Sequence, residues 1–181
     1  MRMFIAIDIG EREEIVDMEK KLEKIEGKIK LVEPWNVHLT LKFLGETKEE
    51  IIPEIKKVME KSVEDISPFS CNLTGVGAFP SMNYVKVVWI GLKDKGETEK
   101  IAQRLEEGLE AHGFKREKRK FTPHITIARV KNVKEKKEMK SFLQEYANAS
   151  FGVLNVNSIV LKKSELRKEG PIYETIEEVK L

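Results

Sequence analysis

The sequence predicts an α+β fold in which two related lobes, each a mostly antiparallel sheet with helices on one face, fold against each other. Strand and helix patterns alternate along the 181 residues without a Gly/Ser/Pro-rich linker. The tetrapeptide His-aliphatic-Thr-aliphatic occurs twice, at 38–41 and 124–127, and a helix and then a strand follow each copy. The length suits one domain, so residues 1–181 are expected to form a single two-lobed unit.

Residues 2–62 are predicted to contain two strands and two helices. Strands are indicated by alternating or continuous aliphatic residues, and helices by apolar residues three or four positions apart. Gly27 is the expected stop of the first helix. Thr47, with Glu50 three positions later, has the pattern of a capping box for the second. In order, the elements are a strand over 2–9, a helix over 11–27, a strand over 37–43 and a helix over 47–62.

Residues 68–179 are predicted to contain two further helices among five strands. The stretch 151–161 alternates without interruption, which predicts one long strand. Proline suggests an irregular loop at 78–81, and polar residues suggest another at 164–170. The strands are expected over 68–73, 84–92, 124–130, 151–161 and 172–179, and the helices over 97–112 and 133–146.

The composition argues against several classes of protein. The 33 basic and 31 acidic residues nearly cancel, so the net charge of +2 does not indicate a general nucleic-acid binder, and any basic surface must be local. The only cysteine, Cys71, excludes an internal disulfide and fits a reducing compartment. No segment has the apolar length of a membrane span, and the first residues lack a signal-peptide pattern. We therefore expect a soluble, cytoplasmic protein without a membrane partner. We also expect it to be a monomer.

The repeated tetrapeptide carries the candidate chemistry. Residues i and i+2 of a strand point to the same face, so each copy would present an imidazole beside a hydroxyl: His38 with Thr40, and His124 with Thr126. Two imidazoles can act as base and acid, and the hydroxyls can donate hydrogen bonds to an anion. These are the parts that phosphoryl transfer needs. No carboxylate cluster or cysteine adjoins either copy, so this layout requires no metal ion.

A single histidine in an apolar strand is more often a packed core residue than a catalyst. The matched second copy favours function, because such a repeat is improbable in a chain with three histidines. The third, His112, lies at the expected end of a helix beside Gly113, where an imidazolium interacts favourably with the helix dipole. We interpret His112 as structural or solvated.

Longer stretches around the two copies, Trp35–Gly45 and Thr122–Arg129, resemble the paired motifs of the two-histidine phosphoesterases. More narrowly, they resemble the 2′-5′ RNA ligase family, whose members are also described as RNA 2′,3′-cyclic phosphodiesterases. The resemblance spans the chain, and the paired motifs are its specific part. Supporting matches lie at Arg2–Ile7, Gly77–Pro80, Ser164–Leu166 and Gly170–Tyr173.

The resemblance implies a bilobal fold with a pseudo-two-fold axis and a central cleft lined by both motifs. It implies opening of a terminal 2′,3′-cyclic phosphate to a 2′-phosphate without metal or cofactor, on RNA ends that include tRNA fragments. His38 would protonate the departing 3′ oxygen and His124 would activate water, although the reverse is chemically symmetrical. Thr40 and Thr126 would hold the phosphate oxygens. An RNA 5′-hydroxyl in place of water would give 2′-5′ ligation without ATP.

Residues beside the motifs are weaker candidates. Arg129, five positions after His124, would lie on the opposite face or at the rim, and is a candidate for contact with the substrate phosphate. Phe43 and Phe4 have rings that could meet a base, with core packing as the alternative. A basic run before the second motif would lie near the cleft mouth and contact the RNA backbone, or remain solvated. Its residues are Lys115, Arg116, Lys118, Arg119 and Lys120.

The sequence leaves two other functions open. A non-catalytic module could grip RNA ends in the same cleft, and turnover would distinguish it from an enzyme. A histidine metal site would need a third ligand, and no further histidine or cysteine is spaced near either motif.

Overall fold

Two antiparallel sheets form the frame of the molecule. The structure is a computed structural model that describes residues 1–181. The first sheet has the strand order β3-β1-β8-β9, and the second has the order β2-β6-β5-β4-β7. The first contains β1 (Arg2–Asp8), β3 (His38–Glu46), β8 (Ser158–Arg167) and β9 (Gly170–Lys180); the second contains β2 (Gly27–Leu31), β4 (Phe69–Ser81), β5 (Tyr84–Lys93), β6 (His124–Val133) and β7 (Ser150–Val156).

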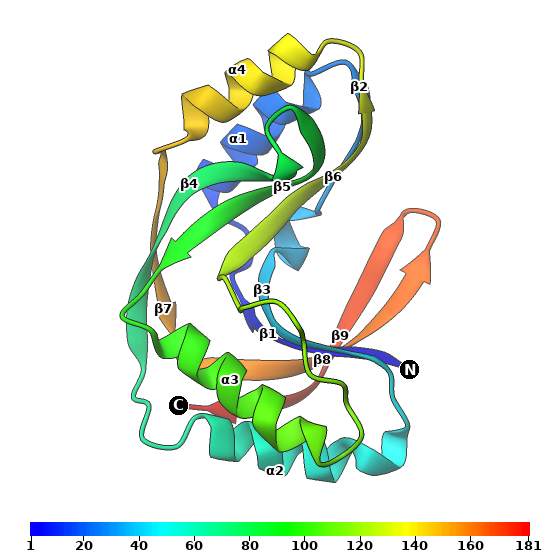
Figure 1. The fold of residues 1–181 in the computed structure, drawn as a ribbon, viewed down its shortest axis with the longest axis vertical. Coiled ribbons are helices and arrows are strands. Elements are labelled where there is room, and N and C mark those ends of the chain that lie inside the picture. Colours follow the sequence, from blue (N-terminus) through cyan, green and yellow to red (C-terminus); the bar gives the residue numbers. More distant parts are fainter.

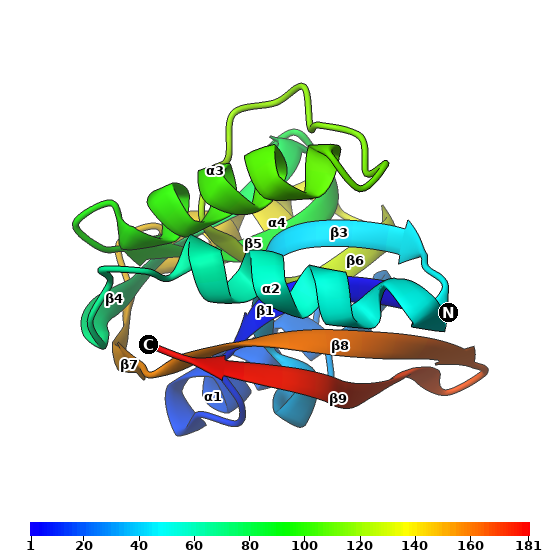
Figure 2. The ribbon, with the colours of Figure 1, turned by 90° about the horizontal axis from the view of Figure 1, so that it is seen from below.

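Two α-helices cover each sheet. α1 (Glu13–Glu23) and α4 (Lys136–Tyr146) pack on the second sheet, whereas α2 (Ile52–Ser62) and α3 (Glu97–Glu110) pack on the first and run side by side (Figure 1 and Figure 2). The chain crosses between the lobes, because α1 follows a strand of the first sheet and α3 a strand of the second. The predicted α+β fold with two antiparallel sheets is confirmed. None of the helices is both long enough and apolar enough to cross a membrane.

The interior is a cluster of 37 buried residues to which both sheets and all four α-helices contribute. On β1, Met3 and Ile5 point into this cluster. Phe4 and Ala6, on the opposite face of the strand, belong to a smaller buried cluster against which half-buried Tyr173 packs. Burial on both faces explains the continuous aliphatic run of β1, which lies in the sheet interior between β3 and β8.

The first predicted helix is too long, and the residues after it form a strand that was not predicted. α1 ends at Glu23, and Gly27–Leu31 form β2, which pairs with β6. Gly27 does not stop the helix: its φ is +148°, and a Cβ atom there would overlap the Asn132 carbonyl oxygen. Glycine is needed because the backbones of β2 and β6 approach closely. β2 is short and only half-buried on one face, which leaves a weak sequence pattern.

The stretch 151–161 is two strands, and the prediction of one was wrong. β7 ends at Val156 and β8 begins at Ser158, and the two strands lie in different sheets. Each strand buries apolar residues, so the pattern continues across Asn157 although the chain changes sheets there.

Both predicted loops belong largely to strands. Residues 78–81 complete β4, with a cis peptide bond between Phe79 and Pro80. Residues 164–170 form the outer part of the β8–β9 hairpin, with its turn between Arg167 and Gly170. Cross-strand pairing satisfies the backbone of these polar residues, which local composition does not reveal.

The predicted capping box is not formed. The Thr47 hydroxyl donates to the Gly45 carbonyl oxygen at 3.0 Å, and α2 begins only after a 3₁₀ turn at Glu49–Ile51. Pro53 lies in the first turn of α2, where its missing N–H group costs no intrahelical hydrogen bond.

Candidate active site

The two motif strands lie beside each other where the sheets meet. β3 is an edge strand of the first sheet, β6 is next to an edge of the second, and the two strands are in contact. The aliphatic motif residues are buried in the core. His38, Thr40, His124 and Thr126 all line one cavity of about 830 Å³. The structure therefore brings together the four motif residues that the sequence singled out.

Both imidazoles are oriented by the same local contact. Nδ1 of His38 lies 2.7 Å from the Asn36 carbonyl oxygen, and Nδ1 of His124 lies 2.8 Å from the Thr122 carbonyl oxygen. A carbonyl oxygen can only accept a hydrogen bond, so each Nδ1 carries a proton and each Nε2 is left for proton exchange. Nε2 of His38 lies 3.1 Å from the Thr40 hydroxyl oxygen, which donates to the neutral ring.

His38 is enclosed by aromatic rings. The ring centroids of Phe4 and Tyr173 lie 4.9 and 5.4 Å from that of His38, so Phe4 packs against the imidazole and is buried. Burial lowers the pKa of His38, and the charge of Lys162 adds to this effect. The Asn36 hydrogen bond and the charge of Asp8 oppose it. The neutral ring is therefore favoured in the free protein.

His124 has a different aromatic wall. Phe79 meets the imidazole edge-on with centroids 4.9 Å apart, and Trp89 lies 6.4 Å away. The Trp89 ring lies over Gly77, where a Cβ atom would overlap the indole. Glycine at this position of β4 therefore allows the Trp89 ring to take its place beside His124.

A β-bulge after each motif returns the fifth residue beyond the histidine to the exposed side of the strand. Two consecutive residues are buried at each bulge, and the strand register shifts there. Phe43 and Arg129 follow the bulges and are exposed, whereas the two histidines on the same side are half-buried. The buried pairs are Leu41 with Lys42 and Ile127 with Ala128.

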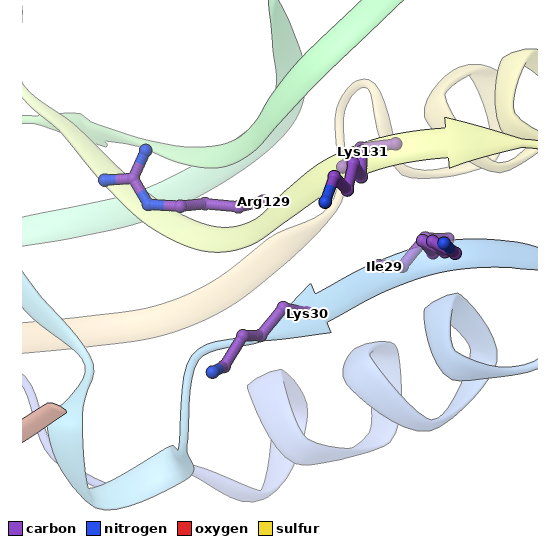
Figure 3. Close-up of a pocket in the computed structure, with 6 residues that line it drawn as sticks. Ile29, Lys30, Arg129 and Lys131 are labelled. Carbon is purple, nitrogen blue, oxygen red and sulfur yellow. The ribbon is translucent and has the colours of Figure 1, made fainter. Parts of the chain in front are cut away.

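Phe43 and Arg129 nevertheless have different surroundings. Phe43 lines the cavity and is 49% exposed, so core packing is excluded. Arg129 lies at the rim, in a separate depression of about 440 Å³ that it shares with Lys30 and Lys131 (Figure 3). Burial raises the pKa of Tyr173, whose ring packs on His38, and the charge of Arg129 opposes this effect.

The basic run lies in the loop between α3 and β6. Arg116, Arg119 and Lys120 line the cavity, whereas Lys115 and Lys118 do not. Acidic neighbours partly neutralise this loop. Arg116 pairs with Glu110 at 3.1 Å and Lys120 with Glu99 at 3.9 Å.

A buried ion pair anchors the same loop. Lys42, only 3% exposed, pairs with Glu106 at 2.9 Å and donates to the Lys115 carbonyl oxygen at 2.7 Å. Glu106 also accepts a hydrogen bond from the Glu117 N–H at 3.0 Å. The bulge in β3 turns Lys42 inward, and the loop thereby becomes attached to the first motif strand.

Sequence reasoning missed the walls and supports of the site. Phe79 and Tyr173 fall in stretches of family resemblance, but nothing local places them or Trp89 against a histidine. Asn36 and Thr122 act through backbone carbonyls, for which side-chain type gives no signal. The signal that could identify these wall residues is an aromatic residue on a strand next to a motif strand. Its use requires the strand order, which the sequence alone does not give.

Known proteins are similar to this chain in sequence and in fold. Residues 13–165 match the family model of the 2′-5′ RNA ligase superfamily. The chain is 42% identical to the RNA 2′,3′-cyclic phosphodiesterase of Methanocaldococcus jannaschii, over 98% of this chain and 99% of the relative, and 38% identical to that of Archaeoglobus fulgidus, over 97% and 98%. The crystal structure of TT0787 of Thermus thermophilus matches with a TM-score of 0.83 at 30% identity, over 100% of this chain and 98% of the other. The chain belongs to the 2′-5′ RNA ligase superfamily.

Proposed function

We propose that this protein is an RNA 2′,3′-cyclic phosphodiesterase that opens a terminal 2′,3′-cyclic phosphate to a 2′-phosphate. One observation carries the proposal: two imidazoles present Nε2 to one cavity beside two threonine hydroxyls. Relatives of that name, similar over nearly their whole length, support it. A cavity of about 830 Å³ lies within the size range of small-molecule sites, which suits a terminal nucleotide.

In the proposed reaction, Nε2 of His124 takes a proton from water while the water oxygen bonds to phosphorus. The bond from phosphorus to O3′ breaks, and Nε2 of His38 gives its proton to O3′. The products are a 2′-phosphate and a free 3′-hydroxyl. The hydroxyls of Thr40 and Thr126 donate to the non-bridging oxygens. The phosphate charge favours the imidazolium form of His38 and so offsets the effect of burial on its pKa.

Residues around the motifs extend the proposed site. Arg129 would reach from the rim toward both the terminal phosphate and the phosphodiester before it, and Phe43 would support the base. Arg116 and Arg119 would contact RNA at the cavity, whereas Lys115 and Lys118 would meet only RNA that extends beyond it.

The proposed substrates are RNA fragments with a 2′,3′-cyclic phosphate end, tRNA fragments among them. With an RNA 5′-hydroxyl in place of water, the reverse reaction would join ends through a 2′-5′ bond without ATP. We propose a cytoplasmic monomer, and the buried free thiol of Cys71 fits a reducing compartment. Incubation with paired tRNA halves, and light scattering of the pure protein, test ligation and the monomeric state.

Substitution of each motif histidine tests the proposed chemistry. His38→Ala and His124→Ala should each lower hydrolysis of a 2′,3′-cyclic nucleotide by about 10²–10⁴-fold, the usual contribution of a general acid or base. His112→Ala is the matched control: His112 lies in the turn after α3, does not line the cavity, and its loss should leave the rate unchanged. The rate should also survive excess chelator.

Full activity in either motif variant would contradict the two-histidine mechanism. Tight binding of RNA ends without any product, even after long incubation, would favour the non-catalytic binding module instead.

A further inference from the structure

We propose that four cations of β2 and β6 bind the RNA backbone upstream of the end held at His38 and His124. These residues, called the β2–β6 platform below, are Lys28, Lys30, Arg129 and Lys131. The inference rests on the proposed function and extends it, because it states where the RNA leaves the cavity.

The platform is a concentration of unpaired positive charge. Its four cations are exposed and line one shallow depression, with Ile29 and Val130 between them. None of the four takes part in an ion pair of the structure. In a chain whose charges nearly cancel overall, this local excess is a feature that an anionic partner would explain.

The strand register places two of these charges directly opposite each other. Lys30 of β2 pairs with Arg129 of β6 in the antiparallel ladder. Like charges in this position destabilise a sheet, and neither residue forms an ion pair with a carboxylate. Both side chains extend in the same direction, back toward the beginning of β6 (Figure 3). A phosphodiester bound between them would remove the repulsion.

β6 connects the platform to the candidate active site. His124 and Thr126 lie at its beginning, and Arg129 and Lys131 follow on its exposed side after the bulge. The seven steps from His124 to Lys131 span about 23 Å at 3.3 Å per residue, a path for several nucleotides. The β8–β9 hairpin borders this path, since a Cβ atom at Gly170 would lie 3.9 Å from Nζ of Lys30.

The loop with the basic run is a less favourable exit for RNA. Arg116 and Lys120 are already paired with Glu110 and Glu99, and Glu106 and Glu117 line the same part of the cavity. A backbone that carries one negative charge per nucleotide therefore gains more on the platform, whose depression no carboxylate lines.

The test is the double variant Lys30→Ala/Lys131→Ala, which leaves Arg129 and the cavity intact. For an RNA of about eight nucleotides with a cyclic-phosphate end, kcat/KM should fall about tenfold at low salt. The slope of log(kcat/KM) against log[salt] should become shallower by about 1.4, or about 0.7 for each lost phosphate contact. Hydrolysis of a cyclic mononucleotide, which reaches only the cavity, should be unchanged.

Lys137→Ala/Lys140→Ala on α4 is the matched control, because it removes two exposed, unpaired lysines from the outer surface. An unchanged RNA rate and salt slope in the platform variant, or an equal loss on the mononucleotide, would overturn the inference. Failure of the unsubstituted protein on the mononucleotide would instead overturn the proposed function. In that case, fluorescence anisotropy still tests whether the platform binds RNA. It compares the affinities of the platform variant and the control variant for an RNA that ends in a 2′-phosphate.

Discussion

In His38 and His124, Nε2 is the ring nitrogen left available for proton exchange, because a backbone carbonyl holds each Nδ1. Their surroundings differ although their motifs match. His38 packs between Phe4 and Tyr173, and burial lowers its pKa, whereas Phe79 and one tryptophan of the second sheet form the wall of His124. The repeat therefore orients the two rings alike, whereas the residues packed around each ring differ.

Lys162 and Asp8 allow the role of His38 to be tested, because they pair at 2.8 Å and bias its proton in opposite directions. Lys162→Gln should raise the pKa of His38, and Asp8→Asn should lower it. With His38 as the acid, activity needs its protonated form, so the alkaline limb of the kcat/KM profile should move up in Lys162→Gln and down in Asp8→Asn. The measurement is kcat/KM for a cyclic mononucleotide from about pH 5 to about pH 9.

An acid limb that moves instead, up in Lys162→Gln and down in Asp8→Asn, would assign the base role to His38. Two limbs that stay in place in both variants would contradict any dependence of the reaction on the His38 proton. Because Lys162 is half-buried, thermal melting of each variant checks that its stability is kept.

At the scale of elements, the shared bulge of β3 and β6 has two consequences. It returns Phe43 and Arg129 to the exposed side, and it turns the preceding residue inward. In β6 that residue is Ala128, which simply packs in the core. In β3 it is Lys42, whose ammonium group binds Glu106 of α3 and the loop before β6. The first motif strand, α3 and the loop over the cavity are thereby held together.

Lys42→Met should lower the free energy of unfolding by about 3 kcal/mol, because Glu106 would stay largely buried without a partner. Adding Glu106→Leu should recover much of that loss, because no unpaired charge then remains. Both variants lose the contact to the Lys115 carbonyl oxygen, so kcat/KM for cyclic-phosphate RNA should stay reduced in the double variant. Denaturant unfolding and steady-state rates measure the two effects.

Lys57→Met is the control for this experiment. Lys57 pairs with Glu54 on the exposed surface of α2, and loss of such a pair costs at most about 1 kcal/mol. A Lys42→Met protein as stable as this control would show that the buried pair does not anchor the loop.

At the scale of the whole molecule, local patterns predicted the two-sheet fold and the four motif residues that the cavity gathers. The repeat, the strand alternation and the helical spacing are all properties of nearby residues. The change of sheet at Asn157 and the pairing of β2 with β6 depend on partners far along the chain. For the same reason, no local pattern identified Trp89 or Tyr173 as a wall of the site, because each meets a histidine only through the strand order.

The crossing of the chain between the lobes predicts how the molecule unfolds. Each lobe takes helices and strands from both halves of the sequence, and the 37-residue cluster runs from one sheet to the other. Neither sheet has a large core of its own. We therefore predict that residues 1–181 unfold as one cooperative unit.

Cys71 provides a probe of that cooperativity. It lies on β4 of the second sheet and is 2% exposed, and burial raises the pKa of its thiol to about 11, so almost no reactive thiolate exists near neutral pH. Its alkylation should need unfolding, with a free energy equal to that from circular dichroism. Cys71→Ser/Leu161→Cys moves the thiol to β8 of the first sheet, and its labelling should likewise match the global unfolding of that variant. A labelling free energy below the global value at one site alone would mean that its lobe opens by itself.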